Sequence, residues 1–339
     1  MPDKRYPRRI LAMRFSALGD VAMTLPLIYS LARQYPDVHI DFITAPFFAR
    51  LFINAPANIT VHPIDLKKDY KGVPGLIRLF RRLKDLNPEA VADLHNVGRT
   101  WMLDTLFRLN GVKIVMVDKM RSGRKKVLRG GNAQPPFIKR YADVFEKLGL
   151  PVRPDFRSLE LASGDNARSV KKPAAGIAPF ARYMNKAYPI DMIKEVAKQL
   201  SQKGVNVYFF GGRGEEAQQL ETLAEGIENV FSLAGKYPIE EELSLMKEMD
   251  VMLTMDSANH HLASLAGTQA ISLWGSTTPS CGFMAYGQPS ENAIVVGVPC
   301  QPCTIAGSNR CKRGDLACFR NISPERVTQK MLSHIELPE

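Results

Sequence analysis

The sequence predicts an α/β protein with two doubly wound domains that face a central cleft. Short apolar segments alternate with amphipathic helical segments along both halves of the chain, which is the pattern of parallel sheets covered by helices. Residues 150–174 interrupt this alternation with prolines and short polar runs, as a linker does. The chain has 339 residues, of which 45% are apolar, so it is long enough for two hydrophobic cores.

Eight segments are predicted to be buried strands because they are short, apolar and bounded by turn residues. They are residues 10–13, 38–44, 90–94, 113–117, 176–179, 205–210, 251–255 and 270–274. Amphipathic spacing predicts helices over residues 21–34, 74–86, 99–109, 137–148, 190–202, 215–225, 240–249, 257–265 and 324–335. We therefore expect a first domain over residues 1–165 and a second over 174–323. A last helix within 324–339 packs on one of them, with the first domain as one option.

Positive charge is concentrated in the first half of the chain. Residues 1–160 contain 28 Lys/Arg and 15 Asp/Glu, whereas residues 161–339 contain 17 and 19, so the excess behind the net charge of +11 lies in the first half. Within it, residues 67–84 and 113–129 each hold seven basic residues and one acid. Such runs are most often solvated faces, yet they also suggest an anionic partner such as nucleic acid, a membrane surface or an acidic substrate.

No targeting or membrane-spanning segment is predicted. The apolar stretch near the N-terminus is interrupted by Arg14 and Asp20, so it does not form the hydrophobic region of a secretory signal. No run of about 18 apolar residues occurs. We therefore expect a cytoplasmic protein.

A first candidate site follows the first predicted strand. Residues 14–20 read Arg-Phe-Ser-Ala-Leu-Gly-Asp and lie between a strand and a helix, where open α/β sheets bind ligands. Gly19 allows the backbone to turn tightly. Asp20 can accept a proton from a substrate hydroxyl as a general base. Aspartate is also a common helix N-cap, so the sequence alone leaves a capping role for Asp20 equally open.

A second candidate site follows the third predicted strand of the second half. The sequence Asp256-Ser-Ala-Asn-His-His261 begins a helix, and the N–H groups at a helix start attract phosphate. His261 lies about one turn after Ser257, so both can face one ligand, whereas Asp256 would cap the helix or accept hydrogen bonds from sugar hydroxyls. A capped core helix with one satisfied histidine is the alternative. Lys186, in an earlier loop, is either a solvated surface charge or a partner for a diphosphate.

Four segments match motifs that one protein family shares in the same order. Residues 10–26 look like its opening strand, its S-x-x-G-D turn and the helix after it, and residues 137–150 look like its R-Y-x6-L-G-L helix. Residues 186–189 are similar to its K-x-W-P turn, and residues 255–275 to its D-[ST]-x3-H helix with the apolar strand that follows. Together they resemble glycosyltransferase family 9, the bacterial heptosyltransferases of lipopolysaccharide core synthesis.

The resemblance implies a GT-B fold, in which a first Rossmann-like domain binds the acceptor and a second binds a nucleotide sugar. It implies inverting, metal-independent transfer with no required cofactor. By position, it implies that Asp20 is the general base. Acceptor binding is predicted for Ser16 and Gly19 in the same turn, and for Arg121, Arg124 and Lys125 in the basic run 113–129. The donor is then bound by Lys186, Glu215, Glu216, Asp256, Ser257, Ala258 and His261. Hydrogen-bond donors fixed toward the diphosphate would stabilise the charge that grows as the glycosidic bond breaks.

The resemblance also implies the partners. The family's acceptors are anionic lipids at the cytoplasmic face of the inner membrane, and a basic first domain would attract both the acceptor and the anionic leaflet, by about 1 kcal/mol per basic residue near the surface. ADP-heptose is the family's best-known donor. Three departures surround the donor site: Ala258 replaces a usual glycine, Tyr188 a usual tryptophan, and Pro179-Phe-Ala181 a usual hydroxyl pair. Another nucleotide sugar therefore stays open as the donor.

The cysteines form a dense cluster late in the chain. Cys300, Cys303, Cys311 and Cys318 are separated by two, seven and six residues, and Cys281 is the fifth cysteine. A cytoplasmic location disfavours stable disulfides and leaves a zinc site or plain thiols. Only the first pair has a standard zinc spacing, so plain thiols are the favoured interpretation.

Three other functions are alternatives to glycosyl transfer. A dinucleotide-dependent oxidoreductase is disfavoured because no G-x-G-x-x-G follows the first strand. A nucleic-acid binder is disfavoured because the basic runs lack interleaved aromatic residues and no recognition motif occurs. A sugar-nucleotide epimerase with the same fold stays open as the alternative to a glycosyltransferase.

Overall fold

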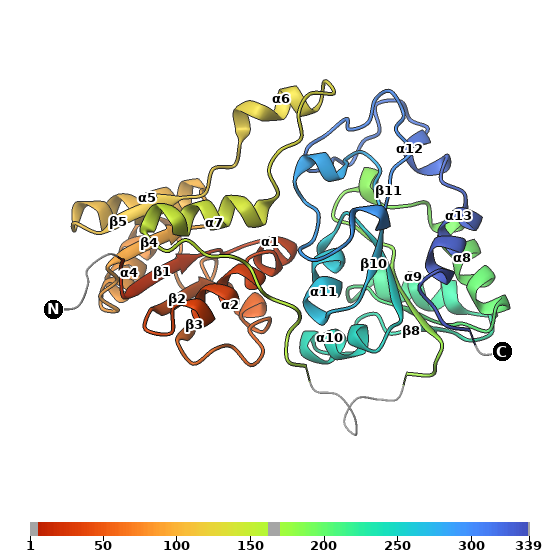
Figure 1. Cartoon of the computed structure of the whole chain (residues 1–339), viewed down its shortest axis with the longest axis horizontal. Coiled ribbons are helices and arrows are strands. Elements are labelled where there is room, and N and C mark those ends of the chain that lie inside the picture. Colours follow the sequence, from red (N-terminus) through yellow and green to blue (C-terminus); the bar gives the residue numbers. More distant parts are fainter. Residues whose placement is uncertain (1–5, 162–169, 338–339) are drawn as a thin grey trace. The chain divides into compact units, whose positions relative to one another are not determined.

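The chain forms two compact units in a computed structural model, which describes residues 6–161 and 170–337 (Figure 1). Unit 1 comprises Met1–Arg121 and Pro135–Arg157, and unit 2 comprises Ser122–Gln134 and Ser158–Glu339. The predicted domain boundary at residue 165 lies outside the described residues. No helix in the described part of the chain is both long enough and apolar enough to cross a membrane.

Unit 1 contains a five-stranded parallel sheet in the order β3-β2-β1-β4-β5. Its strands are β1 (Arg9–Met13), β2 (His39–Thr44), β3 (Ile59–Pro63), β4 (Ala90–Asp93) and β5 (Lys113–Met116). Its helices are α1 (Leu18–Ala22), α2 (Leu25–Gln34), α3 (Pro46–Ala49), α4 (Gly72–Lys84), α5 (Gly98–Leu109) and α7 (Phe137–Leu148). β3 and α3 were not predicted from the sequence.

The sheet of unit 1 is buried because its central strands are apolar on both faces. Leu11 and Met13 of β1 pack with side chains of α4 and α5, such as Leu79 and Phe107. The predicted helix over 21–34 is wrong in one respect, because it is split into α1 and α2. Proline has no N–H to continue a helix, and Pro26 stands in the first turn of α2, where no such hydrogen bond is needed.

Unit 2 contains a six-stranded parallel sheet in the order β11-β10-β9-β6-β7-β8. Its strands are β6 (Ala174–Ala178), β7 (Asn206–Phe209), β8 (Val230–Ser232), β9 (Val251–Met255), β10 (Ala270–Leu273) and β11 (Ala293–Ile294). Its helices are α6 (Arg124–Val127), α8 (Ile190–Gln202), α9 (Glu215–Ala224), α10 (Ile239–Lys247), α11 (Ala258–Ala266), α12 (Ala317–Arg320) and α13 (Pro324–Leu332). Single 3-10 turns are η1 (Arg121–Gly123), η2 (Met184–Lys186), η3 (Pro279–Cys281) and η4 (Ser290–Asn292).

The last helix, α13, packs against α8 within unit 2 rather than on the first domain. Its apolar face, which includes Val327 and Met331, joins the core that α8 and the sheet form. Thr328 also donates a hydrogen bond of 2.9 Å from Oγ1 to Gln199 Oε1 of α8. The option that this helix packs on the first domain is therefore not what the structure shows.

The segment Ser122–Gln134 departs from the predicted first domain, because it belongs to unit 2. Val127 of α6 is buried with Cys281 and Ile305, and the Gln134 N–H donates to the carbonyl of Ser280 at 2.9 Å. An apolar side chain and a backbone hydrogen bond thus hold the segment on unit 2. The α/β class with two doubly wound parallel sheets is confirmed.

Candidate functional site

Each sheet has a topological switch point, where successive connections leave toward opposite edges of the sheet. In unit 1 the switch point lies between β1 and β4, and in unit 2 it lies between β6 and β9. Ligands of open α/β sheets bind outside the carboxyl ends of the strands at such points. The residues that follow β1, β4, β6 and β9 are therefore the candidates for ligand binding.

Asp20 lies just after β1, in the first turn of α1. Its Oδ2 accepts a hydrogen bond of 3.2 Å from the Ala17 N–H and lies 2.6 Å from Nη2 of Arg14. Ala17, not Asp20, is the N-cap residue of α1. Asp20 takes part in capping only because its side chain accepts the hydrogen bond from the N–H of that N-cap residue. Oδ1 of Asp20 has no hydrogen-bond partner among residues 6–161 and 170–337. Gly19 lies inside α1, so the predicted glycine turn is a helical turn instead.

Arg14 fixes the direction of Asp20. Its side chain is 5% exposed, and Nη1 donates to the Leu94 carbonyl at 2.7 Å, immediately after β4. One guanidinium therefore ties the end of β4 to the carboxylate after β1. A charge-assisted contact of this kind keeps the carboxylate in one orientation.

His95, which was not selected from the sequence, lies beside this pair. Its Nε2 is 3.4 Å from Oγ of Ser16, and its Nδ1 is buried with no hydrogen-bond partner in the described chain. Burial and then the positive charge of Arg14 lower the pKa of His95 to about 3, so the ring is neutral at physiological pH. Asp93 shapes the turn by accepting the N–H groups of His95 and Asn96, each at 2.8 Å.

Lys186 and Asp256 meet at the switch point of unit 2. Lys186 ends η2 in the loop after β6, and Asp256 directly follows β9. Nζ of Lys186 lies 2.7 Å from Oδ2 of Asp256, and the Asp256 carboxylate also accepts a hydrogen bond of 2.5 Å from Thr277 Oγ1. Lys186 is therefore not a solvated surface charge. Asp256 does not cap α11, because Ser257 is the N-cap.

The start of α11 offers groups suited to an anion. Ala258 is its first residue, and the Oγ of Ser257 is buried without a hydrogen-bond partner among the described residues. His261 is buried, and burial followed by the charge of Lys186 lowers its pKa to about 3, so the ring is neutral at physiological pH. Free N–H groups at the N-terminus of this nine-residue helix add a partial positive charge.

The cysteine-rich loop holds the turn that carries Lys186. Asn185 Nδ2 donates to Oγ of Ser308 at 2.9 Å, and the Ser308 N–H donates to Oδ1 of Asn185 at 2.8 Å. Gly307 packs so closely that a Cβ atom there would lie 2.6 Å from Cδ of Lys186. Tyr188, at the position of the family's tryptophan, is buried and donates to the Ile322 carbonyl at 2.5 Å. The loop is thus part of the scaffold of the site.

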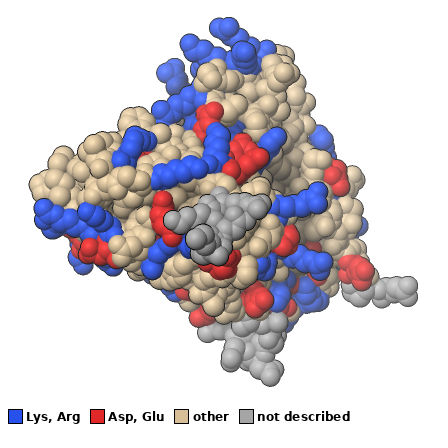
Figure 2. Space-filling view, turned by 60° about the vertical axis from the view of Figure 1, so that its left-hand side comes forward, with Lys and Arg blue, Asp and Glu red and all other residues tan. Residues whose placement is uncertain are grey.

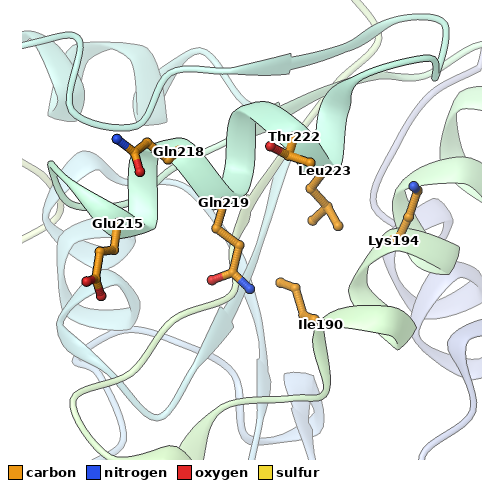
Figure 3. A pocket seen from close by; sticks show the side chains of 7 residues that line it. All are labelled: Ile190, Lys194, Glu215, Gln218, Gln219, Thr222 and Leu223. Atoms are coloured by element: carbon orange, nitrogen blue, oxygen red, sulfur yellow. The ribbon is translucent and has the colours of Figure 1, made fainter.

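Glu215 and Glu216 begin α9 but differ in surroundings. Oε2 of Glu216 accepts the Gly212 N–H at 2.7 Å and so closes the glycine-rich turn before the helix. Glu215 instead lines a cavity of about 440 Å³ between α8 and α9 (Figure 3). Ile190 and Lys194 of α8 face the same space in that view. Glu215 is the freer of the two for a ligand.

The four cysteines of the zinc prediction lie in unit 2, and their role as zinc ligands stays a prediction. No group of three or more His, Cys, Asp or Glu side chains within residues 6–161 and 170–337 could hold a metal ion. Burial and then the nearby thiols of Cys303, Cys311 and Cys300 raise the pKa of Cys318 to about 11. The four cysteines of the zinc candidate are therefore neighbours with free thiols.

The basic residues predicted to bind the acceptor are divided between the two units. Arg121 ends the first segment of unit 1, whereas Arg124 and Lys125 lie on α6 in unit 2. Lys125 is exposed, and Arg124 is half-buried. Figure 2 shows Lys and Arg side chains gathered in groups on the surface, with acidic side chains scattered between them. The three residues therefore do not all belong to unit 1, and their part in acceptor binding stays a prediction.

Comparison with known sequences identifies the family. A family model described as glycosyltransferase family 9 (heptosyltransferase) matches residues 77–312, which is more than half of the chain. The lipopolysaccharide heptosyltransferase 1 of Pseudomonas aeruginosa is 25% identical over 366 aligned positions, covering 98% of this chain and 99% of the relative. The lipopolysaccharide core heptosyltransferase OpsX of Haemophilus influenzae is 23% identical over 290 positions, covering 80% of each protein.

Comparison with solved structures confirms the GT-B fold. A glycosyltransferase family 9 protein from Veillonella parvula superposes with a TM-score of 0.75 at 19% identity, covering 98% of both chains. The ADP-heptose lipopolysaccharide heptosyltransferase II of Escherichia coli gives a TM-score of 0.70 at 18% identity, covering 96% of this chain and 98% of that one. As its sequence motifs predict, the chain belongs to glycosyltransferase family 9, the heptosyltransferase family.

Proposed function

We propose that this chain transfers heptose from ADP-heptose to an anionic lipopolysaccharide-core acceptor, with inversion at the anomeric carbon and with Asp20 as the general base. The observation that carries the proposal is the difference between the two oxygens of the Asp20 carboxylate. Oδ2 is held by Arg14 and by the Ala17 N–H, while Oδ1 has no partner in the described part of the chain. One oxygen fixes the direction of the carboxylate, and the other is available to a substrate hydroxyl.

The chemistry assigned to Asp20 is proton removal. As the acceptor oxygen forms its bond to the anomeric carbon, the hydroxyl proton passes to Oδ1 and the carbon–oxygen bond to the diphosphate breaks. The electrons of that bond leave with ADP. Attack from the face opposite the leaving group accounts for inversion. Arg14 acts as a positioning residue, since it holds the carboxylate but does not itself take the proton.

The chemistry assigned to unit 2 is stabilisation of the leaving diphosphate. Lys186, the buried Ser257 hydroxyl and the free N–H groups of α11 supply one positive charge and several hydrogen-bond donors at one place. These groups support metal-independent transfer. Escherichia coli WaaC, which shares the fold at 18% identity, has been solved with ADP and with ADP-2-deoxy-2-fluoro heptose, which supports an ADP-linked donor.

The acceptor assigned to unit 1 is an anionic glycolipid presented at the cytoplasmic face of the inner membrane. α4 carries Arg81, Arg82 and Lys84 in its last turn, and all three are exposed. An exposed basic helix attracts an anionic leaflet. Peripheral membrane contact through unit 1 is therefore part of the proposal.

The direct test is transfer with purified substrates. Incubation with ADP-heptose and a core acceptor should yield ADP and a heptosylated product of inverted configuration. Asp20→Asn should lower kcat by on the order of 10² or more, the usual size of a general-base effect, and should leave donor binding unchanged. Asp85→Asn, at the exposed end of α4, is the matched control. Near-normal turnover by Asp20→Asn would remove Asp20 from the mechanism.

The same experiment separates two alternatives. A sugar-nucleotide epimerase would alter the donor in the absence of acceptor, whereas the proposed transferase would not. Replacing ADP-heptose with GDP- and UDP-linked sugars tests donor identity. Faster transfer from one of them would correct the donor but keep the glycosyltransferase.

A further inference from the structure

Lys119 is a half-buried lysine close to Asp20 at the carboxyl edge of the unit 1 sheet. Its turn follows β5 and is tied to β4, because the Val117 N–H donates to the Asp93 carbonyl at 2.8 Å and Asn96 Nδ2 donates to the Val117 carbonyl at 2.7 Å. The Met120 N–H also donates to Oδ1 of Asp118 at 2.7 Å. The lysine is therefore placed by a turn that is hydrogen-bonded to the end of β4, at the carboxyl edge of the sheet.

The charges around Lys119 do not balance. Its ammonium interacts with Arg14, Arg121, Asp20 and Asp93. Oδ2 of Asp20 contacts Arg14, and Asp93 accepts the Thr100 hydroxyl at 2.7 Å together with two backbone N–H groups. Within residues 6–161 and 170–337, Lys119 has no ion-pair partner of its own. Of the four charged groups that act most strongly on Lys119, two are arginines and two are carboxylates, and both carboxylates already have partners.

We infer that Lys119 binds an anionic group of the acceptor, a carboxylate or a phosphate that lies near the hydroxyl deprotonated by Asp20. The inference rests on the proposed function and adds the residue that recognises the acceptor's charge. A lysine ammonium is a compact point charge, so it suits either anion. An anion bound there would supply the negative charge that the site lacks, and it would place the acceptor hydroxyl beside the base.

The charge of the Lys119 side chain depends on pH in the alkaline range. Burial, and then the positive charges of Arg14 and Arg121, lower the pKa of Lys119 to about 8. Asp20 and Asp93 act in the opposite direction. Lys119 is therefore charged below about pH 8 and loses its charge above it, whereas an arginine at this position would stay charged.

Steady-state kinetics at saturating ADP-heptose test the inference. Lys119→Gln should raise the KM for the acceptor about tenfold or more, the size of one lost charge-assisted hydrogen bond, and should leave the KM for the donor unchanged. Lys119→Arg should retain the low acceptor KM and keep it low above pH 8, where that of the unmodified protein rises. Lys113→Gln is the matched control, because Lys113 is exposed at the opposite end of the same strand. An acceptor KM that Lys119→Gln leaves unchanged would overturn the inference.

Two altered acceptors identify the anion. One has its carboxyl groups reduced to alcohols, and the other has its phosphates removed. The effect of Lys119→Gln should vanish with one of them and persist with the other, which identifies the group that Lys119 contacts. An effect that persists with both would show that Lys119 does not bind an acceptor anion.

Equilibrium binding separates this inference from the proposed function. Calorimetry with a lipid-free core saccharide that carries both anions needs no turnover. If neither the unmodified protein nor Lys119→Gln transfers heptose, but the variant binds the saccharide more weakly than the unmodified protein does, the transfer proposal fails and the anion site stands. If the unmodified protein and Lys119→Gln bind it equally, the anion site fails, whatever the result of the transfer assay.

Discussion

Lys186 and Asp256 form a buried ion pair, with Nζ and Oδ2 2.7 Å apart and side chains only 12% and 4% exposed. The two residues are 70 positions apart, and they meet because the strands before them, β6 and β9, are neighbours in the sheet. An incoming diphosphate would share the ammonium with Asp256. The pair therefore couples the stability of unit 2 to the residue proposed to bind the donor.

We expect Lys186→Met to weaken both folding and donor binding. Removing the ammonium leaves a buried carboxylate without its cation, which lowers the free energy of unfolding by about 3–5 kcal/mol. Urea denaturation measures that loss. In thermal melts, ADP should raise the Tm of the unmodified protein but not that of the variant, because a ligand stabilises only the protein that binds it.

The double variant Lys186→Met/Asp256→Asn separates these two effects. It should recover much of the lost stability, because no unpaired charge remains buried, and it should still show no shift in Tm with ADP. Lys203→Met, at the exposed end of α8, controls for loss of a lysine. A shift with ADP that survives in Lys186→Met would contradict the assignment of Lys186 to the donor.

We expect Arg14→Met to lower kcat by on the order of 10²-fold, since a carboxylate that is no longer held in one direction is misplaced for proton transfer. Asp20 is 30% exposed on its side chain, so water can solvate it and the loss of stability should be smaller than for Lys186→Met. Arg33→Met removes a surface contact with Asp155 of 2.6 Å in the same unit and should not change kcat. Equal kcat values for the two variants would contradict a positioning role for Arg14.

We expect the stability of unit 1 to fall as the pH rises toward 8. Burial and then the neighbouring Asp93 carboxylate raise the pKa of Asp104 to about 8. A raised pKa in the folded state stabilises the protein at low pH. That contribution is lost as the pH rises from the unfolded value near 4 through about 8.

Thermal melts at pH 5 and pH 8.5 measure this dependence. Asp104→Asn should flatten it, and the variant should gain more than about 1.4 kcal/mol relative to the unmodified protein at the higher pH, the equivalent of one pKa unit. Glu146→Gln, on the exposed face of α7, should leave the dependence unchanged. A pH dependence that is the same in Asp104→Asn would show that another group is responsible.

We expect Gly307→Ala to raise the KM for the donor several-fold. Its φ of +98° is unfavourable for alanine, and the added Cβ would lie 2.6 Å from Lys186 Cδ and 2.7 Å from Tyr183 Cδ2. Gly297→Ala is a matched control, since its φ of +77° imposes similar strain but no atom lies within 4 Å of the added Cβ. Both variants should lose about 1 kcal/mol or more of stability. Only Gly307→Ala should affect the donor, and equal donor KM values would contradict the contact with Lys186.

We expect transfer to continue after metal removal, because Lys186 and the start of α11 supply positive charge to the diphosphate. Metal content is part of the test because TibC of Escherichia coli, a dodecameric glycosyltransferase described as iron-containing, superposes with a TM-score of 0.59 at 14% identity. Activity after treatment with EDTA, together with the metal content of the purified protein, tests the expectation. Activity that is lost and then restored by one metal would refute metal independence.

The sequence was sufficient to predict the fold class because strand and helix periodicity is local. It predicted eight of the strands, but missed the edge strands β3, β8 and β11, of which β8 has three residues and β11 two. It singled out Asp20, Lys186 and His261 as candidate site residues because each stands in a segment that resembles a family motif. Local pattern is therefore enough to predict most of the elements and to select candidate residues within a motif.

The neighbours of those residues could not be predicted in the same way. His95 and Lys119 follow strands β4 and β5, and their proximity to Asp20 depends on the strand order, which the sequence does not state. The basic segment 122–134 was assigned to the first domain because of its place in the chain. Its assignment to unit 2 depends on the burial of Val127 against Cys281, a contact between residues 154 positions apart.

Because Ser122–Gln134 belongs to unit 2 while both flanking segments belong to unit 1, the polypeptide passes between the units three times. A gene fragment that stops at residue 157 would therefore encode Val127 without the apolar surface that covers it. A fragment that starts at residue 158 would expose that surface, including Ile305. To produce the two units separately, Ser122–Gln134 should be attached to the fragment that encodes unit 2. The gap that this segment leaves in unit 1 should be closed with a short linker.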